Sequence, residues 1–311
     1  MMKSSSRRDF LKQMLPAIGG AAVWGRGRAA AALSESKGFA VRLGYAAITW
    51  GAHAEQAIDE ISALGFHGIQ LRSDVLEKWG TRPAELRRRL QAKGLDPVCF
   101  SSGNVDAAPE RRDEYLKTHV DHARFVHALG GRMLQLISRR PEGRAPTPAE
   151  FESLGRLLND IGRRTRELGV ALVYHNHMRG FGESPAEIAQ VLEHSEPECV
   201  SLLLDIAHYQ QGGGDPVAAV ARHQDRLAIV HLKDVVSPLP GDARPARDSY
   251  RFVELGRGQV DVPGVIAALR RIAWSGPAVV ELDAVPDPTR TAAECAAINK
   301  SYVVGTLGLT L

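Results

Sequence analysis

Short apolar runs alternate with longer amphipathic segments along most of the chain. Runs rich in Val, Leu and Ile lie at residues 41–48, 68–71, 97–100, 132–137, 170–174, 200–204, 227–230 and 278–280. Runs of this length and composition are typical of strands buried on both faces of a parallel sheet. The pattern therefore predicts eight parallel strands.

Segments with apolar residues at helical spacing separate these runs, for example at 55–64, 113–129, 150–168 and 185–192. Several helix-to-strand junctions contain a glycine, which suits the left-handed backbone of a helix end: Gly65, Gly94, Gly130 and Gly169. Strict alternation over 311 residues predicts an α/β fold with a single (β/α)8 TIM barrel, which needs roughly 250 residues. We place this barrel at residues 33–311.

Two connections are longer than a turn requires. Residues 138–148 follow the fourth predicted strand, and residues 235–260 follow the seventh. Both would lie at the carboxyl ends of the strands, where long loops serve as lids or binding loops or are simply exposed to solvent.

The first 32 residues differ from the rest in charge. They carry a net charge of +5, which leaves −2 for the remainder of a chain whose total is +3. The run Ser6-Arg7-Arg8-Asp9-Phe10-Leu11-Lys12 resembles a twin-arginine export signal, and small residues suited to cleavage follow at 29–32. The resemblance implies a signal peptide at residues 1–32, the twin-arginine export machinery as a partner and a periplasmic location.

The same numbers argue against two kinds of partner. The apolar stretch 14–24 is too short to be a stable membrane anchor. A mildly acidic mature chain lacks the basic surface that binds nucleic acid.

Four apolar runs in the second half each end in a possible metal ligand: His175, Asp205, His231 and Glu281. Neighbouring strands lie about 4.8 Å apart, so side chains from successive strand ends can meet at one ion. Two imidazoles with two carboxylates favour Mn, Co, Fe, Ni or Zn over Ca or Mg. Each residue alone could have a structural role, but burying two carboxylates together without a cation is costly.

Other polar residues are predicted to surround this cluster. His177 shares strand parity with His175, while His208 and Lys233 follow Asp205 and His231 closely. Asp234 or Glu254 could accept a hydrogen bond from a ligand histidine, and Lys233 could instead form an ion pair with Asp234 or another carboxylate. Candidate substrate contacts, each of which could equally serve barrel packing or the surface, are Trp50, Arg72, Gln135 and His208.

Together these residues resemble the sugar phosphate isomerase/epimerase family, the xylose-isomerase-like TIM barrels. The resemblance rests on the motifs Tyr174-His175-Asn176-His177, Leu204-Asp205-Ile206-Ala207-His208, His231-Leu232-Lys233-Asp234, Gly256-Arg257-Gly258-Gln259-Val260-Asp261 and Glu281. It implies a divalent metal, often manganese, held at His175, Asp205, His231 and Glu281. Ketose 3-epimerases of this family have Glu where this chain has His175. The Tyr-His-Asn-His form is similar to the branch of inosose dehydratases and enzymes that act on 3-keto-glycosides.

The expected function is a metal-dependent sugar isomerase or epimerase that acts on an unphosphorylated keto-sugar or sugar derivative through an enediolate. Glu281 would be the base, His175 or His177 the acid, and Lys233 would stabilise the enolate oxygen. A lyase with the same chemistry, either a dehydratase or a 3-keto-glycoside eliminase, is the first alternative. A noncatalytic periplasmic sugar or metal binding protein is the alternative of another class.

Apurinic endonucleases share this barrel but are not favoured. Their three-metal cluster needs further His and Glu ligands on the early strands, where this chain has Arg72, Ser101 and Gln135.

Overall fold

Eight parallel strands close into a barrel in the order β1-β10-β7-β6-β5-β4-β3-β2. The structure is a computed structural model and describes residues 38–311. All eight predicted strands and the predicted fold class are confirmed. The barrel strands are β1 (Ala40–Ala46), β2 (Gly68–Arg72), β3 (Asp96–Val105), β4 (Met133–Ser138), β5 (Ala171–His175), β6 (Val200–Asp205), β7 (Leu227–Leu232) and β10 (Ser275–Val280).

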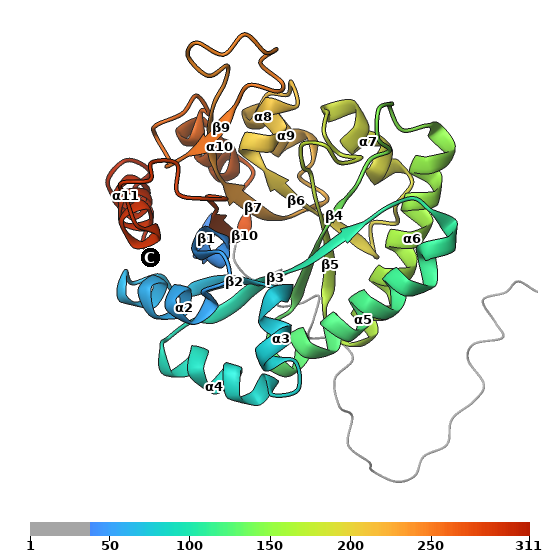
Figure 1. Cartoon of the computed structure of the whole chain (residues 1–311), viewed down its shortest axis with the longest axis horizontal. Helices are drawn as coiled ribbons and strands as arrows, with labels where there is room; N and C mark the ends of the chain where they lie inside the picture. The colour runs from blue at the N-terminus through green and yellow to red at the C-terminus, as the bar shows by residue number, and fades with distance from the viewer. Residues whose placement is uncertain (1–37) are drawn as a thin grey trace, which may run out of the picture. The chain divides into compact units, whose positions relative to one another are not determined.

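Helices surround this barrel (Figure 1). They are α2 (Ala54–Ala63), α3 (Leu76–Trp79), α4 (Pro83–Ala92), α5 (Arg112–Leu129), α6 (Pro148–Glu167), α7 (Pro185–Glu193), α8 (Ile206–Gln211), α9 (Pro216–Arg222), α10 (Val262–Arg271) and α11 (Ala292–Gly305), with short 3-10 turns η1 (Ala47–Trp50), η2 (Ser73–Val75) and η3 (Pro109–Arg111). The four glycines expected at helix ends all have positive φ. Within residues 38–311, no helix combines the length and the apolar character that a membrane crossing needs.

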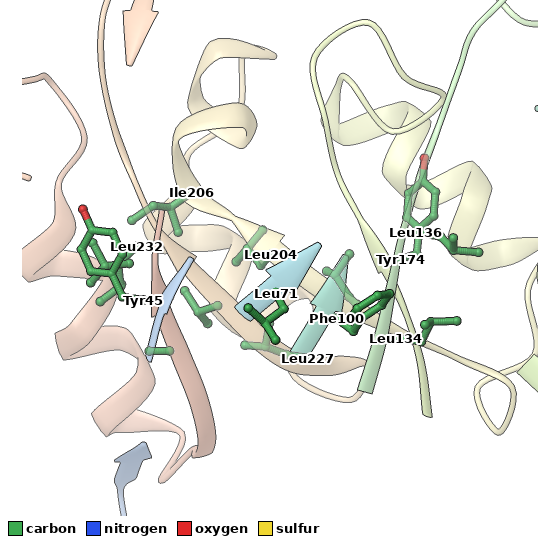
Figure 2. Packing of buried hydrophobic residues seen from close by; sticks show 14 of the residues in the cluster. Tyr45, Leu71, Phe100, Leu134, Leu136, Tyr174, Leu204, Ile206, Leu227 and Leu232 are labelled. Carbon is green, nitrogen blue, oxygen red and sulfur yellow. The ribbon is translucent and has the colours of Figure 1, made fainter. Parts of the chain in front are cut away.

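Alternate residues of each barrel strand face two different cores. The outer core packs strands against helices and includes Tyr45, Leu71, Phe100 and Tyr174 (Figure 2). A smaller inner cluster consists of Ala46, Cys99, Val173, Leu203, Ile229 and Val279. Side chains two residues apart on a strand share a face. The positions two residues after Val173, Leu203, Ile229 and Val279 therefore also face the inside of the barrel.

The connection 235–260 contains structure that the sequence pattern did not predict. Strands β8 (Asp234–Val236) and β9 (Arg251–Val253) pair as an antiparallel hairpin just after β7. Residues 139–147 form an irregular connection between β4 and α6, close to the expected bounds. The proposed signal peptide lies outside the described residues.

Candidate metal centre

Four side chains converge at the carboxyl ends of β5, β6, β7 and β10. One donor atom from each of His175, Asp205, His231 and Glu281 lies within 4.8 Å of the others, and all four side chains are buried. Asp205 Oδ2 lies 3.4 Å from His175 Nε2 and 3.6 Å from His231 Nδ1. Glu281 Oε1 lies 3.4 Å from His231 Nδ1. The barrel thus brings together the four ligands predicted from the sequence.

Local backbone structure aims Asp205 into this cluster. Its Oδ1 caps α8 by accepting the backbone N–H groups of Ala207 and His208 at 3.0 and 2.9 Å. The Asn176 amide bonds the backbone of Asp205 in both directions, donating to its O at 3.0 Å and accepting from its N at 2.8 Å. The cap and the amide fix the carboxylate while leaving Oδ2 free.

The cluster fits a cation. Asp205 Oδ2, His231 Nδ1 and His175 Nε2 are buried and make no hydrogen bond within residues 38–311. An unpaired polar atom in the interior costs about 1–3 kcal/mol, so three at one point indicate a missing partner. Nitrogen and oxygen donors in this mixture suit a divalent transition metal.

Two neutral amides connect the two ligand histidines from the other side. Gln70 Oε1 lies 3.0 Å from His231 Nε2, and Gln70 Nε2 donates to Gln135 Oε1 at 2.8 Å. Gln135 Nε2 lies 2.7 Å from His175 Nδ1. Gln135, predicted as a substrate contact, thus contacts His175 of the cluster. Sequence reasoning missed Gln70, although its place on an inward-facing strand position was a usable signal.

Lys233 is completely buried beside the cluster. Its Nζ lies 3.0 Å from Glu281 Oε1, 2.6 Å from Asp283 Oδ1 and 3.7 Å from Asp205 Oδ2. The same ammonium stands 4.1 Å from the centre of the Phe252 ring on β9. Asp283 was also missed, although it shares strand parity with Glu281.

The ion pair expected of Lys233 with Asp234 or another carboxylate is therefore formed with Glu281 and Asp283, not with Asp234. The suggestion that Asp234 orients a histidine of the cluster is wrong. Its carboxylate instead accepts backbone N–H groups from Val235, Gly256, Gly258 and Val260 at 2.9–3.0 Å. Asp234 therefore shapes the loop after β9. Glu254 likewise pairs with Arg290 and not with a ligand.

His177 and His208 lie next to the ligands. Their ring centroids are 3.9 Å apart, and they lie 5.5 and 5.7 Å from the His175 ring. His177 Nδ1 is 2.7 Å from the carbonyl oxygen of Met178, and His208 Nδ1 accepts the N–H of Met178 at 3.2 Å. A carbonyl only accepts, so Nδ1 of His177 carries the proton and its Nε2 has a free lone pair when the ring is neutral.

The structure does not bring Trp50 into this group. Its Nε1 donates to Glu60 Oε2 of α2 at 2.6 Å, and its ring packs edge-on against Tyr45 at 5.6 Å in the outer core. Turn η1 directs Trp50 outward, which strand parity alone could not show. Arg72 ends β2, where it pairs in register with Ser101 of β3 and is half-buried.

The two histidines of the cluster differ in pKa. Burial lowers the pKa of His175 to about 4. Burial also acts to lower the pKa of His231, but the charges of Glu281 and Asp205 outweigh it and raise that pKa to about 9. Burial would raise the pKa of Glu281, yet the positive charges of His231 and Lys233 hold it well below its usual range.

Comparison with known proteins agrees with this architecture. The xylose isomerase-like TIM barrel family matches residues 58–300. The rhizopine catabolism protein MocC of Rhizobium meliloti is 31% identical over 256 residues, covering 75% of each chain. An inosose dehydratase of Geobacillus kaustophilus (strain HTA426) is 30% identical over 276 residues, covering 79% of this chain and 88% of that protein.

A solved structure of the IolI protein with a bound zinc atom superposes with a TM-score of 0.73 at 18% identity, covering 86% of this chain and 98% of the other. At that identity the likeness concerns the fold. The family match and the MocC relationship extend over most of the sequence, so the chain belongs to the xylose isomerase-like TIM barrel family.

Proposed function

We propose that this protein is a divalent-metal-dependent lyase acting on an unphosphorylated keto-cyclitol or keto-sugar. The substrate would lose a proton next to its ketone and a hydroxyl or alkoxyl group from the following carbon. The observation that carries the proposal is the buried Lys233 ammonium, held 3.0 Å from Glu281 within a cluster of metal-type ligands. Relatives that are inosose dehydratases support elimination over the isomerisation expected first.

Asp205, His231 and Glu281 would hold the metal, with His175 as the fourth side chain of the cluster. When bound, a divalent cation supplies a Lewis acid that polarises a ketone oxygen. Lys233 adds a fixed positive charge beside it, which favours the negative charge that develops on that oxygen. Removal of one such stabilising donor typically costs about 10²–10³-fold in rate.

His177 is the base that the geometry supports best. An effective base needs a pKa near the working pH. Burial lowers the pKa of His177 from its ordinary value, but the pKa of Glu281, which burial would raise, is held well below the ordinary range of a carboxyl group by His231 and Lys233. His177 donates through Nδ1 to Met178 and keeps Nε2 free. Glu281, predicted from sequence as the base, is better suited to holding the metal and orienting Lys233.

The elimination balances without a further reactant. His177 takes the proton from the carbon next to the ketone, and the electron pair of that C–H bond forms the new C=C bond. The C–O bond at the next carbon breaks, and the departing oxygen receives the proton back from His177, directly or through water, and leaves as water or as an alcohol. The ring product is a conjugated enone.

Isomerisation or epimerisation is the second candidate, because reprotonation after the same first step would give it. The absence of a carboxylate at position 175 speaks against epimerisation by two carboxylates. A noncatalytic binding protein would hold substrate without breaking the C–H bond.

One experiment separates these possibilities. Purified protein loaded with Mn²⁺, Co²⁺ or Zn²⁺ is incubated in D₂O with inososes and 3-keto-glycosides and followed by NMR and ultraviolet absorbance. A lyase gives an enone and releases water or a free alcohol. An isomerase or epimerase incorporates deuterium into a sugar without enone formation. Binding without any exchange would contradict both enzyme functions.

We also propose export by the twin-arginine pathway, supported by Arg7 and Arg8 and the residues that follow them. Replacing both with Lys should keep the protein in the cytoplasm, measured by cell fractionation. Unchanged recovery from the periplasm would contradict this route.

A further inference from the structure

The two histidines of the cluster, His175 and His231, are joined by a continuous chain of hydrogen-bonding groups. The chain runs from His175 Nδ1 to Gln135 Nε2, from Gln135 Oε1 to Gln70 Nε2, and from Gln70 Oε1 to His231 Nε2, with distances of 2.7, 2.8 and 3.0 Å. All four side chains are buried, with exposed fractions of 0–4%. Buried polar groups pair donor with acceptor, so each of the three contacts needs one of each.

A chain of amides has a direction, because each amide offers donors at one end and an acceptor at the other. If Nδ1 of His231 is the atom that binds metal, Nε2 carries the proton and donates to Gln70 Oε1. Gln70 then donates to Gln135, and Gln135 donates to His175 Nδ1. His175 must accept at Nδ1, so a neutral His175 carries its proton on Nε2.

Exchanging the oxygen and nitrogen of either amide does not remove this constraint. Turning Gln135 alone sets its NH₂ group against the NH₂ group of Gln70. Turning both makes Gln70 donate to His231 Nε2, so the His231 proton moves to Nδ1 and that atom has no lone pair for a metal. The two histidines therefore cannot both donate outward and both offer a lone pair to the same ion.

We propose that Gln70 and Gln135 are positioning residues that make the two histidines unequal. His231 offers the lone pair of Nδ1 to the metal, and His175 points the N–H of Nε2 into the site as a hydrogen-bond donor. The proposal rests on the proposed function only in assuming that the cluster holds a metal. It leaves Asp205, His231 and Glu281 as the protein ligands.

The surroundings of His175 Nε2 agree with this assignment. Asp205 Oδ2 lies 3.4 Å from it, and it makes no hydrogen bond within the described chain. The N–H is therefore available to a substrate oxygen. In an elimination, such a donor suits the oxygen that leaves.

The direct test reads the position of the proton by NMR. The full-length chain is labelled with ¹⁵N-histidine and loaded with Zn²⁺, and the His175 signals are assigned by their loss in His175→Gln. We expect a proton on Nε2 and a bare Nδ1; a proton on Nδ1 overturns the proposal. His231 donates through Nε2 with or without metal, so the same result is expected in the metal-free protein. Failure to bind Zn²⁺ would count against the proposed function and still leave this readout.

A second test reverses the hydrogen bond between Gln135 and His175, so that His175 donates and residue 135 accepts. Gln135→Glu supplies only acceptors, so it accepts from both Gln70 and His175 and moves the His175 proton to Nδ1. Nε2 then gains a lone pair, and we expect Zn²⁺ to bind at least about 10-fold more tightly, the scale on which outer hydrogen-bond partners tune metal affinity. Gln135→Met is the uncharged control and should give no gain.

The added charge could itself attract the cation, and a double-mutant cycle separates the two causes. If the effect passes through His175, Gln135→Glu gives no gain in a His175→Gln background. An equal gain in both backgrounds would assign it to charge alone and overturn the proposal.

Discussion

The two halves of the barrel mouth contribute different chemistry. Strands β5, β6, β7 and β10 supply four ionisable side chains to one cluster. Strands β2 and β4 supply the neutral amides of Gln70 and Gln135, which contact that cluster from the side. One half therefore supplies the charged groups of the cluster. The other half supplies neutral amides, which hydrogen-bond to the two histidines and add no charge.

This division has an electrostatic cause. Asp205 and Glu281 are buried, and the Lys233 ammonium is placed near both, with Asp283 as its closest partner. A further charge on the amide side would need its own compensation, because each buried ion costs several kcal/mol. Amides supply directed hydrogen bonds at lower cost, so the comparison predicts large effects for the charged half and moderate ones for the neutral half.

The largest effect is expected from Asp205→Ala. This change removes both a metal ligand and the cap of α8, so we expect stoichiometric metal to be lost and the metal-dependent rise in melting temperature to disappear. The matched control is Asp215→Ala, which removes a similar cap from α9 away from the site and should cost only about 1 kcal/mol of stability. Metal analysis and thermal unfolding with and without chelator measure both. Full metal retention by Asp205→Ala and also by His231→Ala would refute the centre.

Lys233→Met should lower turnover by about 10²–10³-fold while metal stays bound, because it removes a charge that stabilises the developing oxyanion. Enone formation and metal content are measured on the same sample. Arg290→Met, which breaks the buried pair with Glu254 away from the cluster, controls for the general loss of an ion pair. Turnover within a few-fold of wild type would assign Lys233 a purely structural role.

The positions of the four charged-half side chains could be predicted from the sequence, whereas the contacts of the neutral amides could not. His175, Asp205, His231 and Glu281 end apolar runs, and strand ends collect at one face of a parallel barrel, so periodicity placed them together. Gln70 contacts His231 across 161 positions of sequence. That contact depends on barrel closure and register, which no local pattern encodes.

Two further differences have local causes. Trp50 follows a strand, yet η1 turns it toward Glu60 of α2. The hairpin of β8 and β9 sits within a connection whose prolines and glycine, Pro238, Pro240, Gly241 and Pro245, suggest a loop. Strand parity predicts neither a turn of the backbone nor a short hairpin that is stabilised by Asp234 and the residues around it.

Gln70→Leu tests the neutral half and should weaken metal binding by about 10–100-fold, since a ligand histidine loses the partner that fixes its ring. The exposed Gln56→Leu, which loses only a contact with Glu60, is the control and should bind metal as wild type does. Titration calorimetry with Zn²⁺ measures both. An unchanged affinity in Gln70→Leu would mean that His231 is oriented by packing alone.

A last test concerns pH, whose effect within one pH unit is small, and it distinguishes the two histidines. Burial acts to lower the pKa of His231 in the metal-free protein, but the charges of Glu281 and Asp205 outweigh it and raise that pKa to about 9, whereas burial lowers the pKa of His175 to about 4. Metal must displace the His231 proton, so the protonation of this residue should lower metal affinity about tenfold for each pH unit below 9. His175 is neutral between pH 6 and 9, so it should not affect the pH dependence of metal affinity there.

The same proton affects the stability of the metal-free fold. Its folded-state pKa lies above the unfolded value of about 6.5, so this stabilisation is fully present below pH 6.5 and is lost as the pH rises through about 9. Denaturant midpoints measured in chelator across this window should therefore decline in the wild type. The decline should be smaller in His231→Asn and unchanged in His175→Gln. An equal loss of slope in both variants would show that the two halves of the mouth do not hold their histidines in different protonation states.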